Sequence, residues 1–282
     1  MPHSRPTQAN ADAAVVDGFG DEWGRFDQAA LGREERQAIF DAYFAVFPWE
    51  RLPDGAIGAD IGCGSGRWAG LVAGRVGTLH CVDASEAALA VARRSLATMP
   101  NVVFHHASVG ALPFAPESLD FAYSLGVLHH VPDTAAGIGA CAHVLKPGAP
   151  FLVYLYYALD NKPAWFRRIW QASDVVRRVV SGLPHPMRYA VSQVLAAAVY
   201  WPLARTARTA ERLGRRVGSF PLAEYRDKSF YTMRTDALDR FGTRLEQRFT
   251  REEIRDMMES AGFQDVRFHE GAPYWCAVGT KA

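Results

Sequence analysis

A regular alternation of short apolar runs and amphipathic segments begins near residue 56. The runs at 56–62, 78–84, 101–107, 119–128 and 150–157 are typical of buried strands. Segments with helical spacing lie between them at 67–74, 86–98 and 134–145. Ser85 and Asp133 are suited to cap two of these helices. Alternating strands and helices with short connections predict a parallel sheet that is covered on both faces.

The alternation stops after residue 157 and resumes near the C-terminus. Thr250 and Glu253 predict a capping box, and Gly262 predicts the end of that helix. Two closing strands follow at 265–270 and 273–281, with a tight connection that favours antiparallel pairing. We therefore divide the chain into an N-terminal cap and helix (1–48), a core (49–159), an insertion (160–248) and a C-terminal return to the core (249–282).

Composition narrows the class of protein. The 282 residues are 49% hydrophobic and 22% charged with net charge +1, so no overall charge points to nucleic acid or membrane. The four cysteines form no CxxC pair, which disfavours a zinc site or a disulfide framework. The first residues lack the apolar core of a signal peptide, and the apolar run 191–204 is too short to span a bilayer. We expect a cytoplasmic protein.

The segment GADIGCGSGRWAG (58–70) carries the first candidate chemistry. Gly62, Gly64 and Gly66 predict a tight turn whose backbone N–H groups approach a ligand at a helix N-terminus. Asp83 ends the second predicted strand, where a carboxylate accepts hydrogen bonds from both ribose hydroxyls. Strand, glycine loop, helix and a second strand ending in an acid predict a nucleoside site, for either NAD or S-adenosylmethionine.

The glycine spacing separates these two nucleosides. The dinucleotide fingerprint GxGxxG needs its third glycine where Arg67 stands, and a reading shifted to Gly64 meets Ala69 instead. The observed order is Asp60-x-Gly-x-Gly-x-Gly. This order disfavours a nicotinamide oxidoreductase, which we keep as an alternative.

Several further motifs occur in a fixed order. They are Leu112-Pro113-Phe114, Leu119-Asp120, Val127-Leu128-His129-His130 and Lys146-Pro147-Gly148-Ala149. Together with the glycine loop, they resemble the class I, Rossmann-like S-adenosylmethionine-dependent methyltransferases, in particular the type 11 small-molecule group. The resemblance covers residues 56–157. It implies a doubly wound, mostly parallel seven-stranded Rossmann-like sheet with an antiparallel last strand and a helical insertion (lid) after strand five.

The resemblance also implies a cofactor, S-adenosyl-L-methionine, and a product, S-adenosyl-L-homocysteine. The glycine loop of such proteins faces the amino-acid part of the cofactor. Ser108 stands where relatives often carry an aspartate that accepts from the adenine amino group, and its hydroxyl can accept the same bond. The candidate cofactor residues are Asp60, Gly62, Cys63, Gly64, Gly66, Asp83, Ala84, Ser108, Val109, Leu125 and Gly126.

Methyl transfer from a sulfonium needs no metal, only alignment of the acceptor and, where required, removal of its proton. His129, at the end of strand four, is the candidate base, because neutral imidazole suits neutral pH. Backbone hydrogen bonding by this ring is the alternative. The candidate acceptor contacts are Trp23, Tyr156, Tyr157, Arg226, Tyr231 and Arg234, and we interpret 225–242 as a pocket-lining loop.

Charge is concentrated in the insertion. Residues 160–235 hold 14 Lys/Arg against 5 Asp/Glu, which leaves +9 there. Peripheral contact with an anionic membrane is one interpretation of this segment, and a solvated basic face is the other. A motif of base-methylating relatives is absent after strand four, so we expect no nucleic-acid substrate.

We predict methyl transfer to a small molecule, at a hydroxyl or carboxylate oxygen, in a natural-product or glycan pathway. N- or C-methylation and a non-catalytic cofactor-binding module remain as alternatives, and the sequence leaves the oligomeric state open.

Overall fold

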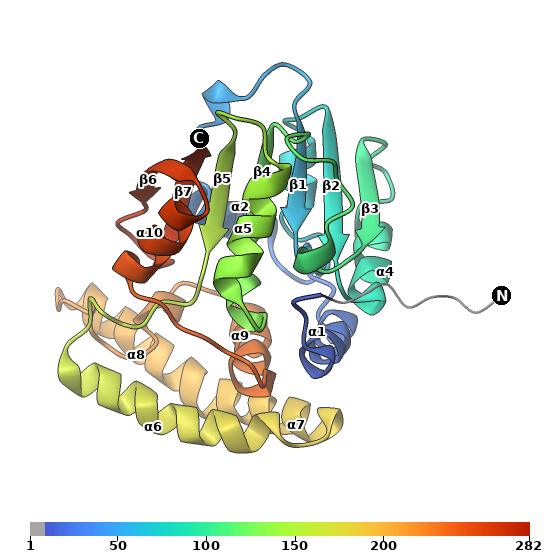
Figure 1. Cartoon of the computed structure of the whole chain (residues 1–282). Coiled ribbons are helices and arrows are strands. Elements are labelled where there is room, and N and C mark those ends of the chain that lie inside the picture. Colours follow the sequence, from blue (N-terminus) through green and yellow to red (C-terminus); the bar gives the residue numbers. More distant parts are fainter. Residues whose placement is uncertain (1–8) are drawn as a thin grey trace. The chain divides into compact units, whose positions relative to one another are not determined.

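The computed structural model describes residues 9–282, and its sheet confirms the predicted fold class (Figure 1). The strands are β1 (Ile57–Ile61), β2 (Thr78–Asp83), β3 (Val102–His106), β4 (Phe121–Leu125), β5 (Pro150–Tyr154), β6 (Phe263–Phe268) and β7 (Cys276–Lys281). They lie in the order β3-β2-β1-β4-β5-β7-β6. β1 to β5 pair in parallel, and β7 is antiparallel to both β5 and β6. The strand order reverses between β1 and β4, where ligands of such sheets bind.

The chain divides into two compact units. The sheet unit contains the described residues up to Asp27, Ile39–Ala158 and Leu245–Ala282, and the helical unit contains Gln28–Ala38 and Leu159–Arg244. The helices are α1 (Ala13–Arg25), α2 (Arg33–Tyr43), α3 (Ala69–Ala73), α4 (Glu86–Ser95), α5 (Thr134–Val144), α6 (Ala164–Ser181), α7 (His185–Leu195), α8 (Trp201–Arg212), α9 (Phe230–Gly242) and α10 (Arg251–Ser260).

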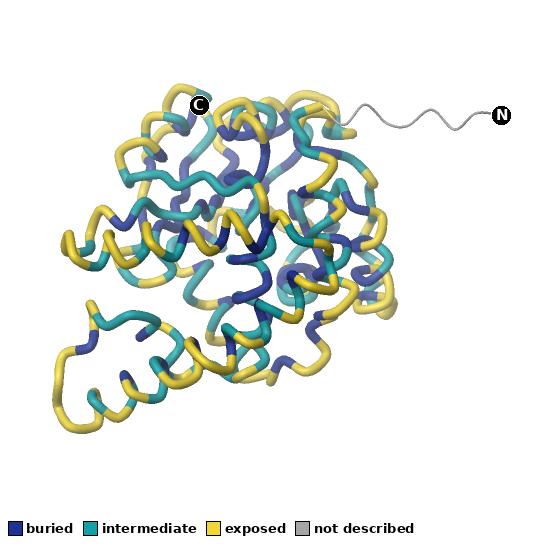
Figure 2. The backbone as a smooth tube through the Cα atoms, turned by 90° about the horizontal axis from the view of Figure 1, so that it is seen from below, coloured by how far each residue is buried: buried dark blue, intermediate teal, exposed yellow. Residues whose placement is uncertain are grey.

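Helices cover both faces of the sheet, because successive residues of each strand point to opposite sides. On one face Ala122 and Phe151 pack in a core that includes side chains of α5 and α10. On the other, Phe121 and Leu152 pack with side chains of α3 and α4 and with Phe40 near the end of α2. Most residues of the central strands are accordingly buried, and Figure 2 colours the backbone by this burial, with buried residues in dark blue.

Three local predictions are confirmed. The side chains of Ser85 and Asp133 accept from backbone N–H groups in the first turns of α4 and α5. Thr250 and Glu253 form the capping box of α10. Each cap satisfies a helical N–H that has no partner within the helix.

Two local predictions are wrong. The segment 225–242 is not a loop, because α9 spans Phe230–Gly242 with Ser229 as its N-cap. Tyr156 lies beyond β5, which ends at Tyr154, and Tyr157 pairs in an isolated bridge with Phe249. Phe249, where the chain has returned from the helical unit, is therefore a pairing partner of Tyr157 that the alternation of strands and helices in the sequence does not predict.

The helical unit has a core of its own. Val180 of α6 packs with Tyr200, Ala204, Met233 and Phe241, which come from α8, α9 and the π-helical turn at 196–200 between α7 and α8. Asp174 of α6 is buried and accepts from Arg177 at 2.6 Å, so this charge is paired inside the unit. These contacts explain how the insertion folds despite its net charge.

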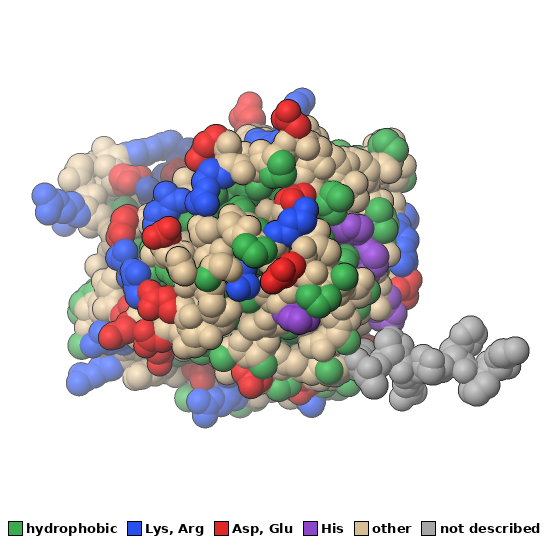
Figure 3. Space-filling model, turned by 45° about the horizontal axis from the view of Figure 1, so that its top comes forward, with side chains coloured by type: hydrophobic (Ala, Val, Ile, Leu, Met, Phe, Trp, Pro, Cys, Tyr) green, Lys and Arg blue, Asp and Glu red, His purple; other side chains and the backbone are tan. Residues whose placement is uncertain are grey.

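Charged side chains of both signs are interspersed on the face seen in Figure 3, in keeping with the small net charge of the whole chain. Within residues 9–282, no helix combines the length and the apolar character needed to cross a membrane.

Two half-buried histidines meet between β2 and β3. Nδ1 of His80 lies 2.9 Å from Nε2 of His105, and both rings pack near Phe114. Burial lowers the pKa of both side chains below the usual 6.5, and for His80 the charge of His105 adds to the effect. Because one ring must donate and the other accept, protonation of both rings breaks this hydrogen bond.

This pair makes the sheet edge sensitive to acid. Since the folded pKa values are lowered, the stability contributed by the neutral pair is complete above pH 6.5 and declines as the pH falls below that value. We expect His105→Gln to lower this pH dependence, with a change below about 1 kcal/mol because both rings remain partly solvated. Urea unfolding at pH 7.5 and 5.5 measures the change in unfolding free energy between the two pH values, with exposed His143→Gln as the control. The same change in the wild type and in both variants would contradict the assignment.

Candidate functional site

The glycine loop lies at the carboxyl end of β1, where the strand order reverses. Gly62 has a φ of +82°, and a Cβ at this position would stand 2.4 Å from a methyl group of Val127. The backbone N–H groups of Gly62 and Cys63 both donate to the carbonyl oxygen of Val82, at 2.7 and 3.0 Å. Only glycine tolerates this combination of backbone conformation and close approach, so the loop is held against the ends of β2 and β4.

Asp83 joins this loop to the next helix. One carboxylate oxygen accepts from the Gly64 N–H and the other from the Ser85 N–H, each at 2.8 Å. Burial raises the pKa of Asp83, while the Ser85 and Gly64 amides act in the opposite direction. Each carboxylate oxygen keeps a second lone pair. The group can therefore accept two further hydrogen bonds, such as those of a ribose diol.

Asp60 is a second carboxyl group at the same edge, and it is buried more deeply than Asp83. Its Oδ2 accepts from the hydroxyl of Tyr123 at 2.9 Å, and its residue is 2% exposed. Burial raises its pKa to about 7, and the negative charge of Asp83 adds to this, whereas the Tyr123 hydrogen bond lowers it. Without a neighbouring cation, Asp60 is thus close to half protonated at neutral pH. A bound ammonium group would favour its ionised form.

Ser108 follows β3 and is buried. Its hydroxyl donates to the carbonyl oxygen of Ala9 at 2.8 Å. Because the proton is used in this way, the lone pairs of the oxygen are left to accept. A nucleobase amino group is a suitable donor for that position.

The other candidate cofactor residues lie at strand ends of the same unit. Val109 begins a 3₁₀ turn, and Ala84 follows β2 and offers its carbonyl oxygen to His106. Leu125 ends β4, and Gly126 follows with a φ of +79° and donates to the Tyr154 carbonyl oxygen at 3.1 Å. The structure thus places all eleven candidates at the carboxyl edge of the sheet.

Helix α1 contributes aromatic side chains beside this edge. The indole nitrogen of Trp23 lies 2.8 Å from the point where a Cβ on Gly64 would stand. The ring of Phe19 lies 5.0 Å from that of His130. Trp23, a candidate acceptor contact, is therefore beside the glycine loop. Gly64 has to be glycine in this arrangement, since a side chain there would collide with the indole.

His129 lies in a 3₁₀ turn directly after β4 and is completely buried. Its ring stacks on Tyr156 with centroids 3.9 Å apart, and its Nδ1 accepts from the Tyr156 N–H at 3.4 Å. At that distance the hydrogen bond holds the ring's tautomer only weakly. Nε2 is buried and has no hydrogen-bond partner among residues 9–282. A buried nitrogen without a hydrogen-bond partner is uncommon in a protein interior.

The surroundings of His129 keep it neutral. Burial lowers its pKa well below 6.5, and the charges of His130 and Arg248 act in the same direction. The Arg248 guanidinium lies 5.1 Å from the centre of the Tyr156 ring and donates to the Tyr157 carbonyl oxygen. His130 donates from Nδ1 to the Leu245 carbonyl oxygen at 2.6 Å, as expected of a ring with a structural role.

The remaining candidate acceptor residues belong to the helical unit. Arg226 pairs with Glu211 at 2.7 Å, and Arg234 donates to the Tyr189 hydroxyl at 2.8 Å. The Tyr231 hydroxyl accepts from the N–H of Gln28. All three side chains take part in contacts within the helical unit, and their acceptor roles stay predictions.

Sequence reasoning missed three residues of the sheet unit. Tyr123 binds Asp60, Arg248 faces Tyr156, and Arg67 stacks on Trp68 with a buried Nε that has no partner in the described part of the chain. Only Arg67 had a local signal, since it directly follows the glycine loop. Tyr123 and Arg248 contact residues that are far away in the sequence, so no local pattern indicates them.

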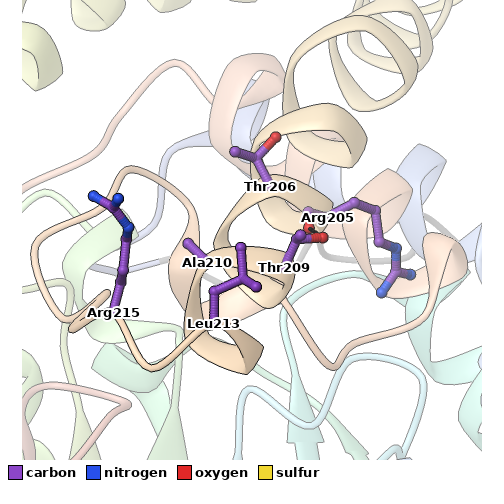
Figure 4. Close-up of a pocket in the computed structure, with 6 residues that line it drawn as sticks. All are labelled: Arg205, Thr206, Thr209, Ala210, Leu213 and Arg215. Carbon is purple, nitrogen blue, oxygen red and sulfur yellow. Dashed lines mark hydrogen bonds between the residues drawn. The ribbon is translucent and has the colours of Figure 1, made fainter.

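A shallow hollow of about 420 Å³ opens elsewhere, on α8 of the helical unit (Figure 4). It is lined by Arg205, Thr206, Thr209, Ala210, Leu213 and Arg215. The two arginines lie on opposite sides of the hollow, and Arg205 already donates to the carbonyl oxygens of Arg226 and Lys228. The hollow therefore offers no convergent set of catalytic groups, and the candidate site remains at the carboxyl edge of the sheet.

Known proteins carry the same core. Residues 59–148 match the family model described as a methyltransferase domain. Over 108 residues, the chain is 39% identical to the ubiquinone biosynthesis O-methyltransferase of Thiobacillus denitrificans, covering 37% of this chain and 44% of that protein. It is 33% identical over 108 residues to a probable S-adenosylmethionine-dependent methyltransferase of Mycolicibacterium smegmatis, covering 37% and 41%. The chain thus spans less than half the length of these relatives.

A solved structure extends the likeness in fold. A chain from the complex of the Haloferax volcanii Trm112 methyltransferase activator with a putative methyltransferase aligns with a TM-score of 0.50 and 15% identity. The alignment covers 93% of this chain and 96% of that one. At this identity the likeness concerns the fold alone.

The raised pKa of Asp60 gives a pH-dependent test. Its folded value of about 7 exceeds the usual 3.8, so the carboxyl group costs no stability below pH 3.8 and destabilises the fold progressively as the pH rises toward 7. We expect Asp60→Asn to raise the free energy of unfolding at pH 8 by on the order of 1 to 4 kcal/mol, and this gain to vanish near pH 4. Denaturant titrations measure it, with exposed Asp54→Asn as the control. A gain of equal size at both pH values would contradict the assignment.

Proposed function

Since the chain carries a class I, Rossmann-like S-adenosylmethionine-dependent methyltransferase domain, we propose that it transfers the methyl group to an oxygen of a small molecule. The observation that carries this proposal is the partly buried Asp83 carboxylate, which accepts from the N–H of Gly64 in the glycine loop at the point where the strand order reverses. That placement suits a nucleoside whose attached chain continues toward the glycines.

The residues at the sheet edge fit S-adenosylmethionine group by group. In this proposal, Asp83 accepts from the ribose hydroxyls and Ser108 accepts from the adenine amino group. Asp60 supplies negative charge for the ammonium group, and the guanidinium of the partly buried Arg67, whose Nε has no partner in the described structure, supplies positive charge for the carboxylate. The bound cofactor supplies a methyl group on a positively charged sulfur. The protein's part is then to position the acceptor and to receive its proton.

His129 is the side chain that we assign to the acceptor. In the neutral ring whose Nδ1 accepts from Tyr156, the proton is on Nε2. Once that proton is on Nδ1 instead, which gives up only the weak 3.4 Å bond, Nε2 can take the proton of a hydroxyl; this nitrogen has no hydrogen-bond partner in the described structure. Tyr156 supports the ring from one side, and Arg248 lies beyond Tyr156. Burial excludes water, so the imidazole and a hydroxyl would meet without competing hydrogen bonds.

Oxygen is favoured over nitrogen or carbon by two observations. A base is most useful for a hydroxyl, whose proton must leave for the oxygen to attack. Several of the relatives found by sequence are named O-methyltransferases, although the chain covers less than half of their length. A carboxylate acceptor fits the same site with His129 donating from Nε2. We keep the natural-product or glycan pathway as a prediction of the sequence.

Calorimetric titration tests the cofactor assignment. We expect the chain to bind S-adenosylmethionine and S-adenosylhomocysteine but not NAD⁺. Asp83→Ala should weaken both by at least about 30-fold, because hydrogen bonds to a charged group contribute about 1.5–3 kcal/mol each. The control, Asp54→Ala, removes an exposed carboxylate of the same unit and should bind as the wild type does. Binding of NAD⁺ alone, or equal affinities for the two variants, would refute the assignment.

The pH profile of the reaction tests His129. Since its pKa is lowered, the neutral form is present at and above pH 6.5, so kcat should be flat there and should fall only in more acidic solution. His129→Gln keeps a hydrogen-bond donor but cannot take a proton, and we expect kcat to fall about 100-fold or more with a hydroxyl acceptor. A Gln variant of wild-type activity would exclude the base role and leave His129 as an orienting group.

A further inference from the structure

Helix α6 (Figure 1) carries an apolar stripe that the fold leaves uncovered. Trp165, Ile169, Val176 and Val179 are 50%, 53%, 44% and 65% exposed. Their spacing of three, four and seven places them on one side of the helix, along about 21 Å of its axis. The buried side of α6 is a different one and holds Asp174, Arg177, Val180 and Ser181. The stripe is therefore not part of the core of the helical unit.

Only positive charge accompanies the stripe. By helical spacing Arg168 flanks the stripe, and Arg167 and Arg178 are exposed on the opposite side of the same helix. The one acidic residue of α6 is Asp174, which is buried and accepts from Arg177 at 2.6 Å and from Arg178 at 2.9 Å. No carboxylate is thus exposed anywhere along α6. The exposed surface of α6 therefore holds large apolar side chains and guanidinium groups, and it has no negative charge that would repel an anion.

We propose that α6 lies in the headgroup region of an anionic lipid bilayer, with its apolar stripe toward the acyl chains. An amphipathic helix with apolar side chains on one side and arginines on its remaining exposed surface binds at this depth and orientation. Trp165 suits the boundary between apolar and hydrated layers, and each arginine attracts anionic headgroups. The helix is amphipathic and carries five charged residues, so it lies in the surface and does not cross it.

A second copy of the chain is a poorer occupant of the stripe. A twofold contact between the stripes of two α6 helices would bring the two copies of Arg168 together, and the exposed surface of α6 has no carboxylate to neutralise them. An anionic bilayer offers both an apolar phase and the opposite charge. The apolar stripe and the positive charge of α6 are therefore complementary to an anionic bilayer and not to a second α6.

Vesicle co-sedimentation with the full chain tests this proposal without any need for methyl transfer. We expect binding to vesicles of phosphatidylcholine mixed with phosphatidylglycerol, and little binding to phosphatidylcholine alone. Ile169→Glu with Val176→Glu should weaken binding at least about tenfold. Arg167→Ala with Arg168→Ala should weaken it about fivefold for each charge removed. The matched control, Ala97→Glu with Ala135→Glu, adds the same charges at exposed positions of the sheet unit and should bind as the wild type does.

Two further readouts guard against misinterpretation. Circular dichroism establishes that each variant is folded. Brominated acyl chains should quench tryptophan fluorescence in the wild type, and Trp165→Phe should lose most of that quenching. Failure to bind anionic vesicles, equal loss in the control, or binding that persists when the stripe carries two glutamates would overturn the proposal. So would a dimer in solution that the stripe variant dissociates.

Discussion

The geometry of the site depends on one partly buried carboxylate. Asp83 accepts from the N–H of Gly64 in the glycine loop and from the N–H of Ser85 at the start of α4. It thereby joins two segments that a parallel sheet places side by side but does not connect. A carboxylate is costly to bury, and two backbone donors repay only part of that cost, as its raised pKa indicates. The remaining acceptor capacity is what a ribose diol would satisfy.

Other polar side chains near Asp83 are likewise only partly satisfied by hydrogen bonds within the protein. Asp60 is held by Tyr123, Ser108 uses its proton on Ala9, and His129 keeps a buried Nε2 with no partner in the described part of the chain. Each of these side chains is partly satisfied by protein and retains one specific capacity to accept or donate. Buried groups of this kind are rare in a structural core, because each costs free energy. Their concentration at one edge of the sheet supports a binding and transfer role.

Local signals were sufficient for most of the fold. Ser85, Asp133 and the Thr250–Glu253 pair cap the helices that they predict, because a cap acts within four residues. Glycine spacing likewise predicted the loop. Helix α9 was missed because its start is stabilised from a distance: Glu35 accepts from the N–H of Ser229 and from the hydroxyl of Thr232. Tyr123 was missed for the same reason, since it meets Asp60 only across two paired strands.

A crystal structure of the chain with S-adenosylhomocysteine tests the central claim most directly. The account predicts both ribose hydroxyls within hydrogen-bond distance of Asp83, the adenine amino group beside the Ser108 hydroxyl, and the sulfur on the side of His129. A ligand bound away from the glycine loop, or a ribose that does not contact Asp83, would contradict it.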